Sequence, residues 1–163
     1  MSPAAALEAS ALARAMREWL WLYPSVEIVH IVGIALLFGS IAVLDLRLLG
    51  FSKTRISVRR LAWQVLPWSA AAFLLIVPSG LLMFTAHASD FLGNPVFPIK
   101  MGLILLAGVN AAAFHTIAMR TADVWDTEEM KDLRPPVSVR LAGAISLLIW
   151  ISVIACGRLL AYF

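Results

Sequence analysis

The stretch VEIVHIVGIALLFGSIAVL, residues 26–44, decides the fold of this chain. It contains a single glutamate and a single histidine, and an apolar helix of about 20 residues spans the hydrocarbon core of a bilayer. Three further stretches of similar character follow, at residues 61–86, 99–119 and 141–161. The sequence therefore predicts an all-α integral membrane protein, a four-helix bundle that forms one transmembrane domain over residues 1–163.

The composition of the chain supports a membrane protein and excludes several other classes. Hydrophobic residues make up 61% and charged residues 14% of the chain, and its mean hydropathy of +0.88 lies outside the range of soluble domains. The single cysteine, Cys156, excludes an intramolecular disulfide. No hydrolase or nucleotide-binding motif is found. The basic residues cluster beside the apolar stretches, so we expect the lipid bilayer as a partner and no nucleic acid.

The distribution of lysine and arginine predicts the orientation of the spans. Short loops that are rich in these residues stay in the cytoplasm. Around the turn between the second and third apolar stretches the only basic residue is Lys100, at the start of the third stretch. The segments after the first and third stretches carry many more, namely Arg47, Lys53, Arg55, Arg59, Arg60, Arg120, Lys131, Arg134 and Arg140. We therefore expect a multi-pass protein of the bacterial inner membrane with both termini on the periplasmic side.

The first 24 residues predict an amphipathic helix that lies on the outer membrane surface. Apolar side chains recur there at helical spacing, opposite Arg14, Arg17 and Glu18. The apolar set is Leu12, Met16, Trp19, Leu20 and Tyr23. Pro24 is expected in the turn into the first span, and residues 93–95, Gly-Asn-Pro, in the turn before the third.

Five ionisable residues from the four spans are predicted to reach a similar depth near the periplasmic face. His30, Lys100 and Arg158 are placed by a rise of about 1.5 Å per residue from the basic residue at the cytoplasmic end of the span. Glu27 lies one turn before His30, and His87 ends the second span on the same side. The five are Glu27, His30, His87, Lys100 and Arg158. Ionisable groups inside a membrane usually face the bundle interior and serve a function. We expect the functional site where these residues converge.

The two histidines of this set predict a b-type haem site. His30 and His87 would donate their imidazole nitrogens to one iron, and Arg158 and Lys100 would pair with the propionates. Gly33 and Gly80 lie on the same helix faces as the histidines and would give space to the macrocycle. The predicted function is a cytochrome-like electron-transfer protein that binds one haem b near the periplasmic face. It would exchange electrons between a periplasmic redox partner and quinone.

Other interpretations of the same residues stay open. His30 and His87, with Met83 and Cys156, could bind copper in a metal transporter, or the cluster could handle protons. Alternatively, the polar groups only hold helices together in a subunit of a larger membrane complex. His87 would then be a histidine at the membrane interface. Glu27 and Arg158 would form a structural ion pair that holds the first and fourth spans together.

A secondary polar cluster is predicted near the cytoplasmic face. His115 lies about 18 Å deeper than His30 by the same helical rise, with Asp45 and Arg47 as expected neighbours. This group could hold a proton, bind a quinone carbonyl or lock helix ends together. If the spans tilt strongly, Gly108 would give His115 the space to pair with His30. Glu27, near the periplasmic face, is a further candidate among the polar residues of the spans.

Four segments of the chain resemble a family of uncharacterised bacterial four-helix inner-membrane proteins. They are EIVHIVGIALLFGSIAVLDLRLLGF (27–51), LPWSAAAFLLIVPSGLLMFTAHASDFLGNPVFPIK (66–100), GVNAAAFH (108–115) and WISVIACGRLLAYF (150–163). The resemblance implies fold and topology but no chemistry. In layout the chain is also similar to small four-helix b-type cytochromes and to the membrane domains of CopD-like copper proteins. Its three histidines limit it to one haem with two axial imidazoles.

Overall fold

The computed structural model describes residues 2–51, 57–118 and 135–162, in which all regular structure is helical. Four stretches are long and apolar enough to cross a membrane, as the sequence predicted. They are α3 (Leu22–Leu48), α4 (Val58–Ala86), α6 (Val96–Ala113) continued by the π-helical turn η1 (Phe114–Ala118), and α8 (Val137–Leu159). The predicted all-α fold with four spans is confirmed. Lys53, Arg55, Arg120, Lys131 and Arg134, on which the orientation was predicted, lie outside the described residues.

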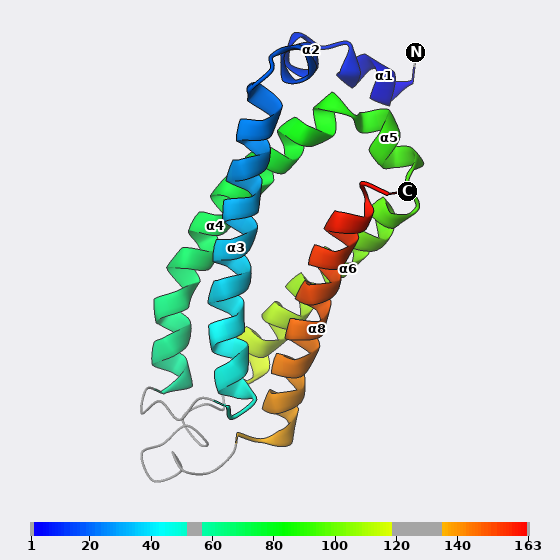
Figure 1. The fold of residues 1–163 in the computed structure, drawn as a ribbon. Helices are drawn as coiled ribbons and strands as arrows, with labels where there is room; N and C mark the ends of the chain where they lie inside the picture. Colours follow the sequence, from blue (N-terminus) through cyan, green and yellow to red (C-terminus); the bar gives the residue numbers. More distant parts are fainter. Residues whose placement is uncertain (1, 52–56, 119–134, 163) are drawn as a thin grey trace.

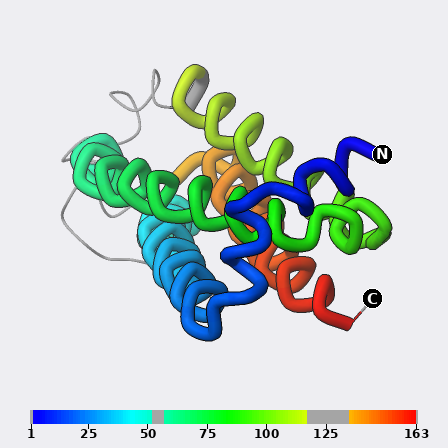
Figure 2. Tube along the Cα trace, turned by 90° about the horizontal axis from the view of Figure 1, so that it is seen from above, coloured from blue at the N-terminus to red at the C-terminus, as the bar shows by residue number. Residues whose placement is uncertain are grey.

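The four long helices form two pairs that meet at one end. Helices α3 and α4 pack along each other, as do α6 and α8 (Figure 1). Both chain termini lie at one end of the molecule, here called the terminal end, and the opposite end is called the loop end. Helices α3 and α8 approach each other near the loop end and separate toward the terminal end (Figures 1 and 2). Gly143 permits this approach, because a Cβ there would lie 3.1 Å from Leu48 Cβ and 3.2 Å from the Asp45 carbonyl oxygen.

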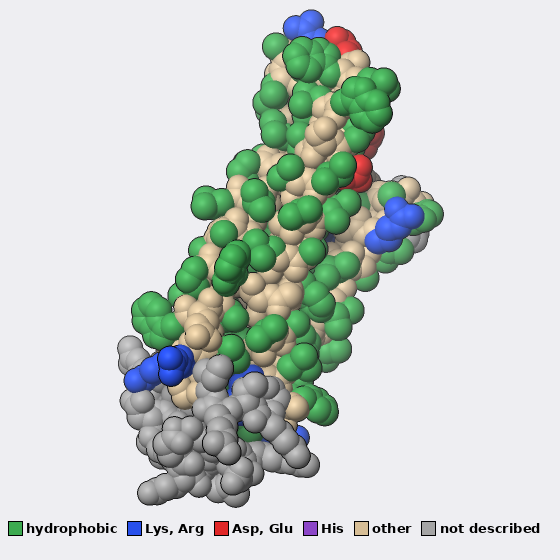
Figure 3. Space-filling model, turned by 60° about the vertical axis from the view of Figure 1, so that its left-hand side comes forward, with side chains coloured by type: hydrophobic (Ala, Val, Ile, Leu, Met, Phe, Trp, Pro, Cys, Tyr) green, Lys and Arg blue, Asp and Glu red, His purple; other side chains and the backbone are tan. Residues whose placement is uncertain are grey.

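Few apolar side chains of the spans are buried within the chain itself. One cluster at the loop end contains Leu48, Val58, Phe114 and Val139, and another between α6 and α8 contains Ala107, Ile149 and Val153. Large side chains such as Leu74 and Leu105 are 76% and 72% exposed. Hydrophobic side chains cover the visible flank, and lysine and arginine lie toward the helix ends (Figure 3). A surface this apolar is suited to lipid contact rather than to water.

The N-terminal segment differs from the single helix predicted over residues 1–24. It forms two short helices, α1 (Pro3–Glu8) and α2 (Ala11–Glu18). The break occurs because the Ser10 side chain accepts a hydrogen bond from Ala13 N and starts a new helix. Ala13 and Met16 of α2 are buried, and the two helices cross over the terminal end of the bundle (Figure 2). Pro24 lies in the first turn of α3 rather than before it, a position that tolerates proline.

The connection between the second and third spans contains one short helix, α5 (Ala88–Gly93), that the sequence did not predict. The turn predicted at residues 93–95 follows it. Asn94 is buried in this turn, where its side chain accepts from Val96 N at 2.9 Å and donates to the Leu160 carbonyl at 3.2 Å. The turn is thereby tied to the C-terminal end of α8.

Glu8 and Arg17 fasten the N-terminal helices to the corner between α4 and α5. Glu8 Oε1 accepts a hydrogen bond from Ser89 N at 2.7 Å. The Arg17 guanidinium donates to the Ala86 carbonyl at 2.8 Å and to the Glu8 carbonyl at 2.7 Å. Arginine thus satisfies a carbonyl that the end of α4 leaves without a helical partner.

The Glu8 contact is expected to weaken in acid. The Ser89 backbone hydrogen bond, aided by nearby Arg17, lowers the pKa of Glu8 below its ordinary value. A carboxyl whose folded pKa is depressed stabilises the docked state at neutral pH, and that contribution is lost as the pH falls through the folded pKa. Hydrogen-exchange protection factors of residues 3–18 should therefore be constant above the ordinary carboxyl pKa of 4.5 and fall as the pH is lowered below it.

A Glu8→Gln variant separates this effect from general acid unfolding. Its protection factors should be lower than those of the wild type at neutral pH and should change less with acid. Glu18→Gln is the matched control, because Glu18 is an exposed acid of the same segment. An identical acid response in Glu8→Gln and in the wild type would contradict the assignment.

Candidate functional site

His30 is held against α4 by one well-defined hydrogen bond. Its Nδ1 lies 2.9 Å from Ser79 Oγ, and the Ser79 hydroxyl donates to the Leu75 carbonyl within its own helix. A serine hydroxyl has one proton to give, so Ser79 accepts from His30 and Nδ1 carries the imidazole proton. The other ring nitrogen, Nε2, keeps its lone pair and has no hydrogen bond to any described residue.

The two glycines expected to make room for a macrocycle lie instead in the contact between α3 and α4. A Cβ on Gly80 would lie 3.1 Å from His30 Cε1, so this glycine accommodates the imidazole itself. A Cβ on Gly33 would lie 2.7 Å from Ile76 Cγ1 and 3.1 Å from Leu75 Cβ. Both glycines therefore bring the two helices close enough for His30 to reach Ser79.

Lys100 is the basic residue at the start of the third span, and its side chain lies beside α8. It is half-buried at the start of α6, and its Nζ would be 3.5 Å from a Cβ on Gly157 of α8. In the described part of the chain no carboxylate forms an ion pair with Lys100. Its charge is thus free to meet an external anion.

His87 and His30 do not meet at one level. The His30 ring contacts Gly80, and His87 lies seven residues later, which is roughly 10 Å along a helix. Two nitrogens on opposite sides of one iron are only about 4 Å apart, twice a metal–nitrogen bond of about 2 Å. His87 is 41% exposed at the terminal end, where its Nδ1 lies 3.4 Å from Asp90 Oδ2 and its ring contacts Tyr23 edge-on at 5.6 Å. The structure therefore separates the two expected ligands.

The remaining residues of the expected site face outward. Arg158 donates to the Tyr162 hydroxyl at 2.7 Å and lies 4.9 Å from the centre of that ring. Glu27 is exposed, and no ion pair between it and Arg158 is present among the described residues. The predicted convergence into one cluster is thus not found among the described contacts: His30 lies against α4 and Lys100 against α8, and Glu27 and Arg158 are exposed.

The secondary cluster predicted at the other end of the bundle is also divided. Asp45 and Arg47 are only 4% and 7% exposed, and the Asp45 side chain hydrogen-bonds to Ser146 of α8. His115 is instead exposed, with its Nδ1 3.0 Å from the Ala111 carbonyl and its ring against Phe114. Phe114 occupies the buried face of this turn, so the next residue points away from Asp45. None of these contacts joins His115 to Asp45 or Arg47, which were its expected neighbours.

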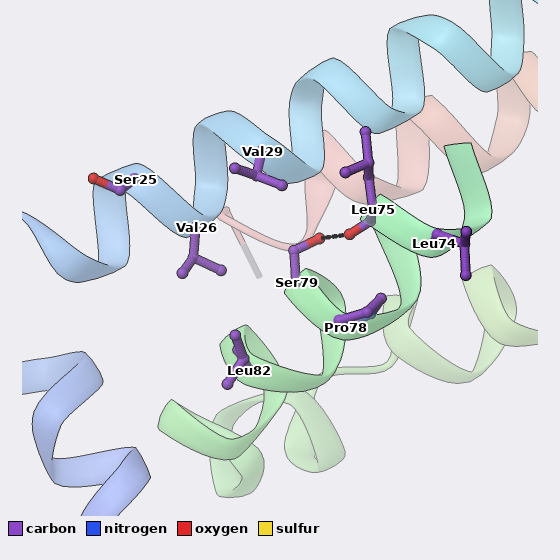
Figure 4. A pocket seen from close by; sticks show the side chains of 8 residues that line it. All are labelled: Ser25, Val26, Val29, Leu74, Leu75, Pro78, Ser79 and Leu82. Atoms are coloured by element: carbon purple, nitrogen blue, oxygen red, sulfur yellow. Dashed lines mark hydrogen bonds between the residues drawn. The ribbon is translucent and has the colours of Figure 1, made fainter. Parts of the chain in front are cut away.

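A groove of ≈ 300 Å³ lies between α3 and α4. Its walls are apolar except for two serine side chains (Figure 4). The lining residues are Ser25, Val26, Val29, Leu74, Leu75, Pro78, Ser79 and Leu82. Ser79 thus links the groove to the imidazole through a single hydrogen bond.

Sequence reasoning missed both serine partners, Ser79 and Ser146. Each is a buried hydroxyl within a span, next to or near a glycine of a close helix contact. A serine close to a glycine within an apolar span was the sequence signal that could have identified both residues. The copper set was not supported, because the described residues hold no group of three or more His, Cys, Asp or Glu side chains that could bind a metal ion.

Comparison with known proteins gives a family but no chemistry. Residues 8–163 match the model of a family of unknown function, DUF6644. The chain belongs to this family. No curated protein and no solved structure matches it. Membership of DUF6644 agrees with the expected uncharacterised family, and the likeness to b-type cytochromes and CopD-like domains stays a prediction.

Proposed function

We propose that this DUF6644 protein is a b-type haem protein of the bacterial inner membrane that exchanges electrons with quinone. One haem would lie in the terminal half of the bundle, which we take as the periplasmic side. The observation that carries the proposal is the hydrogen bond between His30 Nδ1 and Ser79 Oγ. It leaves Nε2 as a neutral electron-pair donor inside a membrane span.

This arrangement is the one that metal-binding histidines use. Such a histidine usually donates its other ring N–H to a fixed acceptor, which sets the tautomer and the orientation of the ring. Ser79 is buried, and its own proton is engaged by the Leu75 carbonyl. His30 would therefore present Nε2 to iron without losing its hydrogen bond to Ser79. Gly80, which has no side chain, would leave space for the ring against α4.

The charge of Lys100 favours a ligand that carries negative charge. A half-buried ammonium group without a carboxylate partner favours an anion, because leaving the charge unpaired in a low-dielectric region is costly. A haem propionate would supply that anion through a charge-assisted hydrogen bond. Arg158 follows Gly157, which Lys100 contacts, and would provide a second cation at the same helix end.

His87 has no place as the second ligand of the same iron in this proposal. When bound, the haem would provide a one-electron couple with a single protein imidazole. Ser79 would keep the His30 tautomer fixed, and the apolar groove beside Ser79 would admit a quinone ring from the bilayer (Figure 4). A periplasmic redox partner would dock at the terminal end.

The absorption spectrum of the purified protein tests haem binding. After haem-replete expression, the detergent-solubilised chain should show a Soret band with about one haem per chain. Elemental analysis of the same sample should find iron and no stoichiometric copper. Absence of the Soret band would contradict the proposal. A protein that contains copper instead would favour the metal-transport alternative.

Lys100 offers a quantitative test of the propionate contact. Lys100→Gln should bind haem roughly 10- to 100-fold more weakly, because a hydrogen bond to a charged group contributes about 1.5–3 kcal/mol. Lys100→Arg keeps the charge and should lose much less. Haem titration of the apo-protein, followed at the Soret band, measures both. Equal affinities of Lys100→Gln and the wild type would contradict the propionate role.

A further inference from the structure

We propose that Asp45 is a protonated intramembrane carboxylic acid that binds and exchanges a proton at the loop end of the bundle. The inference is independent of haem binding, because Asp45 and His30 lie in opposite halves of α3. It concerns a group that the proposed haem chemistry does not use.

The first support is the burial of a carboxyl group of which one oxygen has no hydrogen bond. Asp45 lies on α3 at its contact with α8 and is only 4% exposed. Its Oδ2 atom has no hydrogen-bond partner among the described residues. An ionised carboxylate needs donors at both oxygens when it is removed from water, whereas the neutral acid needs fewer. The geometry therefore favours the protonated form.

The charged groups around Asp45 do not change this conclusion. Arg47 is two residues further along α3, and Arg140 lies one turn before Gly143 on α8. Among the described residues no ion pair joins Arg140 to Asp45, and His115 on η1 is exposed. Arg59 and Arg60 at the start of α4 are exposed as well. The group that does face Asp45 is the Ser146 hydroxyl, which hydrogen-bonds to its side chain.

The second support is the position of Asp45 close to the helix end. It lies three residues before Leu48, the last residue of α3, and is thus about one turn from the loop end. Gly143 lets α8 pass directly beside it, with a Cβ position 3.7 Å from Asp45 Cα. A proton from water at the loop end therefore needs to travel only a short distance to reach the carboxyl group.

A proton fits this site better than a metal cation does. Sodium or calcium requires a shell of several oxygen ligands, and Ca²⁺ takes 6–8 of them. Asp45 and Ser146 supply two side-chain groups, and no larger acidic group is found among the described residues. A proton requires one acceptor. Acidic residues in membrane spans commonly serve as such proton sites.

Infrared spectroscopy of the full chain in lipid vesicles tests the proposal. With aspartate labelled by ¹³C at its carboxyl carbon, the wild type should show the C=O band of a neutral acid at neutral pH. The band should shift in D₂O, which reports exchange of the proton. It should vanish in Asp45→Asn and change frequency in Ser146→Ala, because the Ser146 hydrogen bond is lost.

Two comparisons keep the test decisive. Asp90→Asn removes an exposed aspartate of the terminal end and should leave the band unchanged. If Asp45→Asn does not fold, the frequency change in Ser146→Ala assigns the band instead. An ionised carboxylate spectrum of the wild type at neutral pH would overturn the proposal. A neutral-acid band that survives in folded Asp45→Asn, or that does not shift in D₂O, would overturn it equally.

Discussion

His30→Ala is expected to lose almost all of its haem. The change removes the imidazole that Ser79 orients, and weakening the outer partner of a metal ligand alone typically costs about 10- to 100-fold in affinity. Loss of the ligand itself should therefore exceed about a hundredfold. The haem-to-protein ratio of the purified variant measures the effect.

His87→Ala is the matched control for this experiment. The His87 side chain is partly exposed, its Nδ1 lies 3.4 Å from Asp90 Oδ2, and it lies roughly two turns from the His30 ring. We expect His87→Ala to keep its haem at the wild-type ratio. Far-UV circular dichroism and gel filtration should show that both variants stay folded. Equal haem loss in the two variants would contradict the assignment of His30 as the protein ligand.

Gly143→Ala is expected to destabilise the fold by disturbing the contact between α3 and α8. The new Cβ would lie 3.1 Å from Leu48 Cβ and 3.2 Å from the Asp45 carbonyl oxygen. A backbone atom cannot rotate away, so α3 and α8 must separate. Overpacking of this kind costs about 1–3 kcal/mol, and the free energy of unfolding in mixed lipid–SDS micelles should fall by that amount.

Gly108→Ala provides the comparison, since nothing lies within 4 Å of a Cβ at that position. Both substitutions make the same change in helix propensity. The difference between the two variants therefore isolates the contact of α3 with α8. Equal unfolding free energies would show that this contact does not hold the two helix pairs together.

The sequence was sufficient for the transmembrane architecture because the signal comes from length and composition alone. A stretch such as residues 26–44 has no stable alternative in a bilayer, where each backbone polar group must bond within its own helix. The N-terminal helices were harder to predict. Whether Ser10 continues one helix or caps a new one depends on the docking of Ala13 and Met16 against the rest of the chain.

The candidate site could be predicted only in part, for a geometric reason. Helical rise gives the depth of a residue, but the partner of its side chain depends on how the helices rotate against each other. His30 and Lys100 were predicted in the correct half of the bundle. Gly80 was predicted to give space to a haem beside His87, and in the structure a Cβ at Gly80 would lie 3.1 Å from the His30 ring. Ser79 was overlooked because a lone serine in an apolar span gives little signal.

The electron paramagnetic resonance spectrum of the ferric haem-loaded protein tests most directly whether His30 is the sole protein ligand of the iron. One axial imidazole, with the opposite position left open, predicts a high-spin signal that is lost together with the haem in His30→Ala and unchanged in His87→Ala. A low-spin signal typical of two axial imidazoles, removed by His87→Ala, would contradict the separation of the two histidines and the single-ligand site.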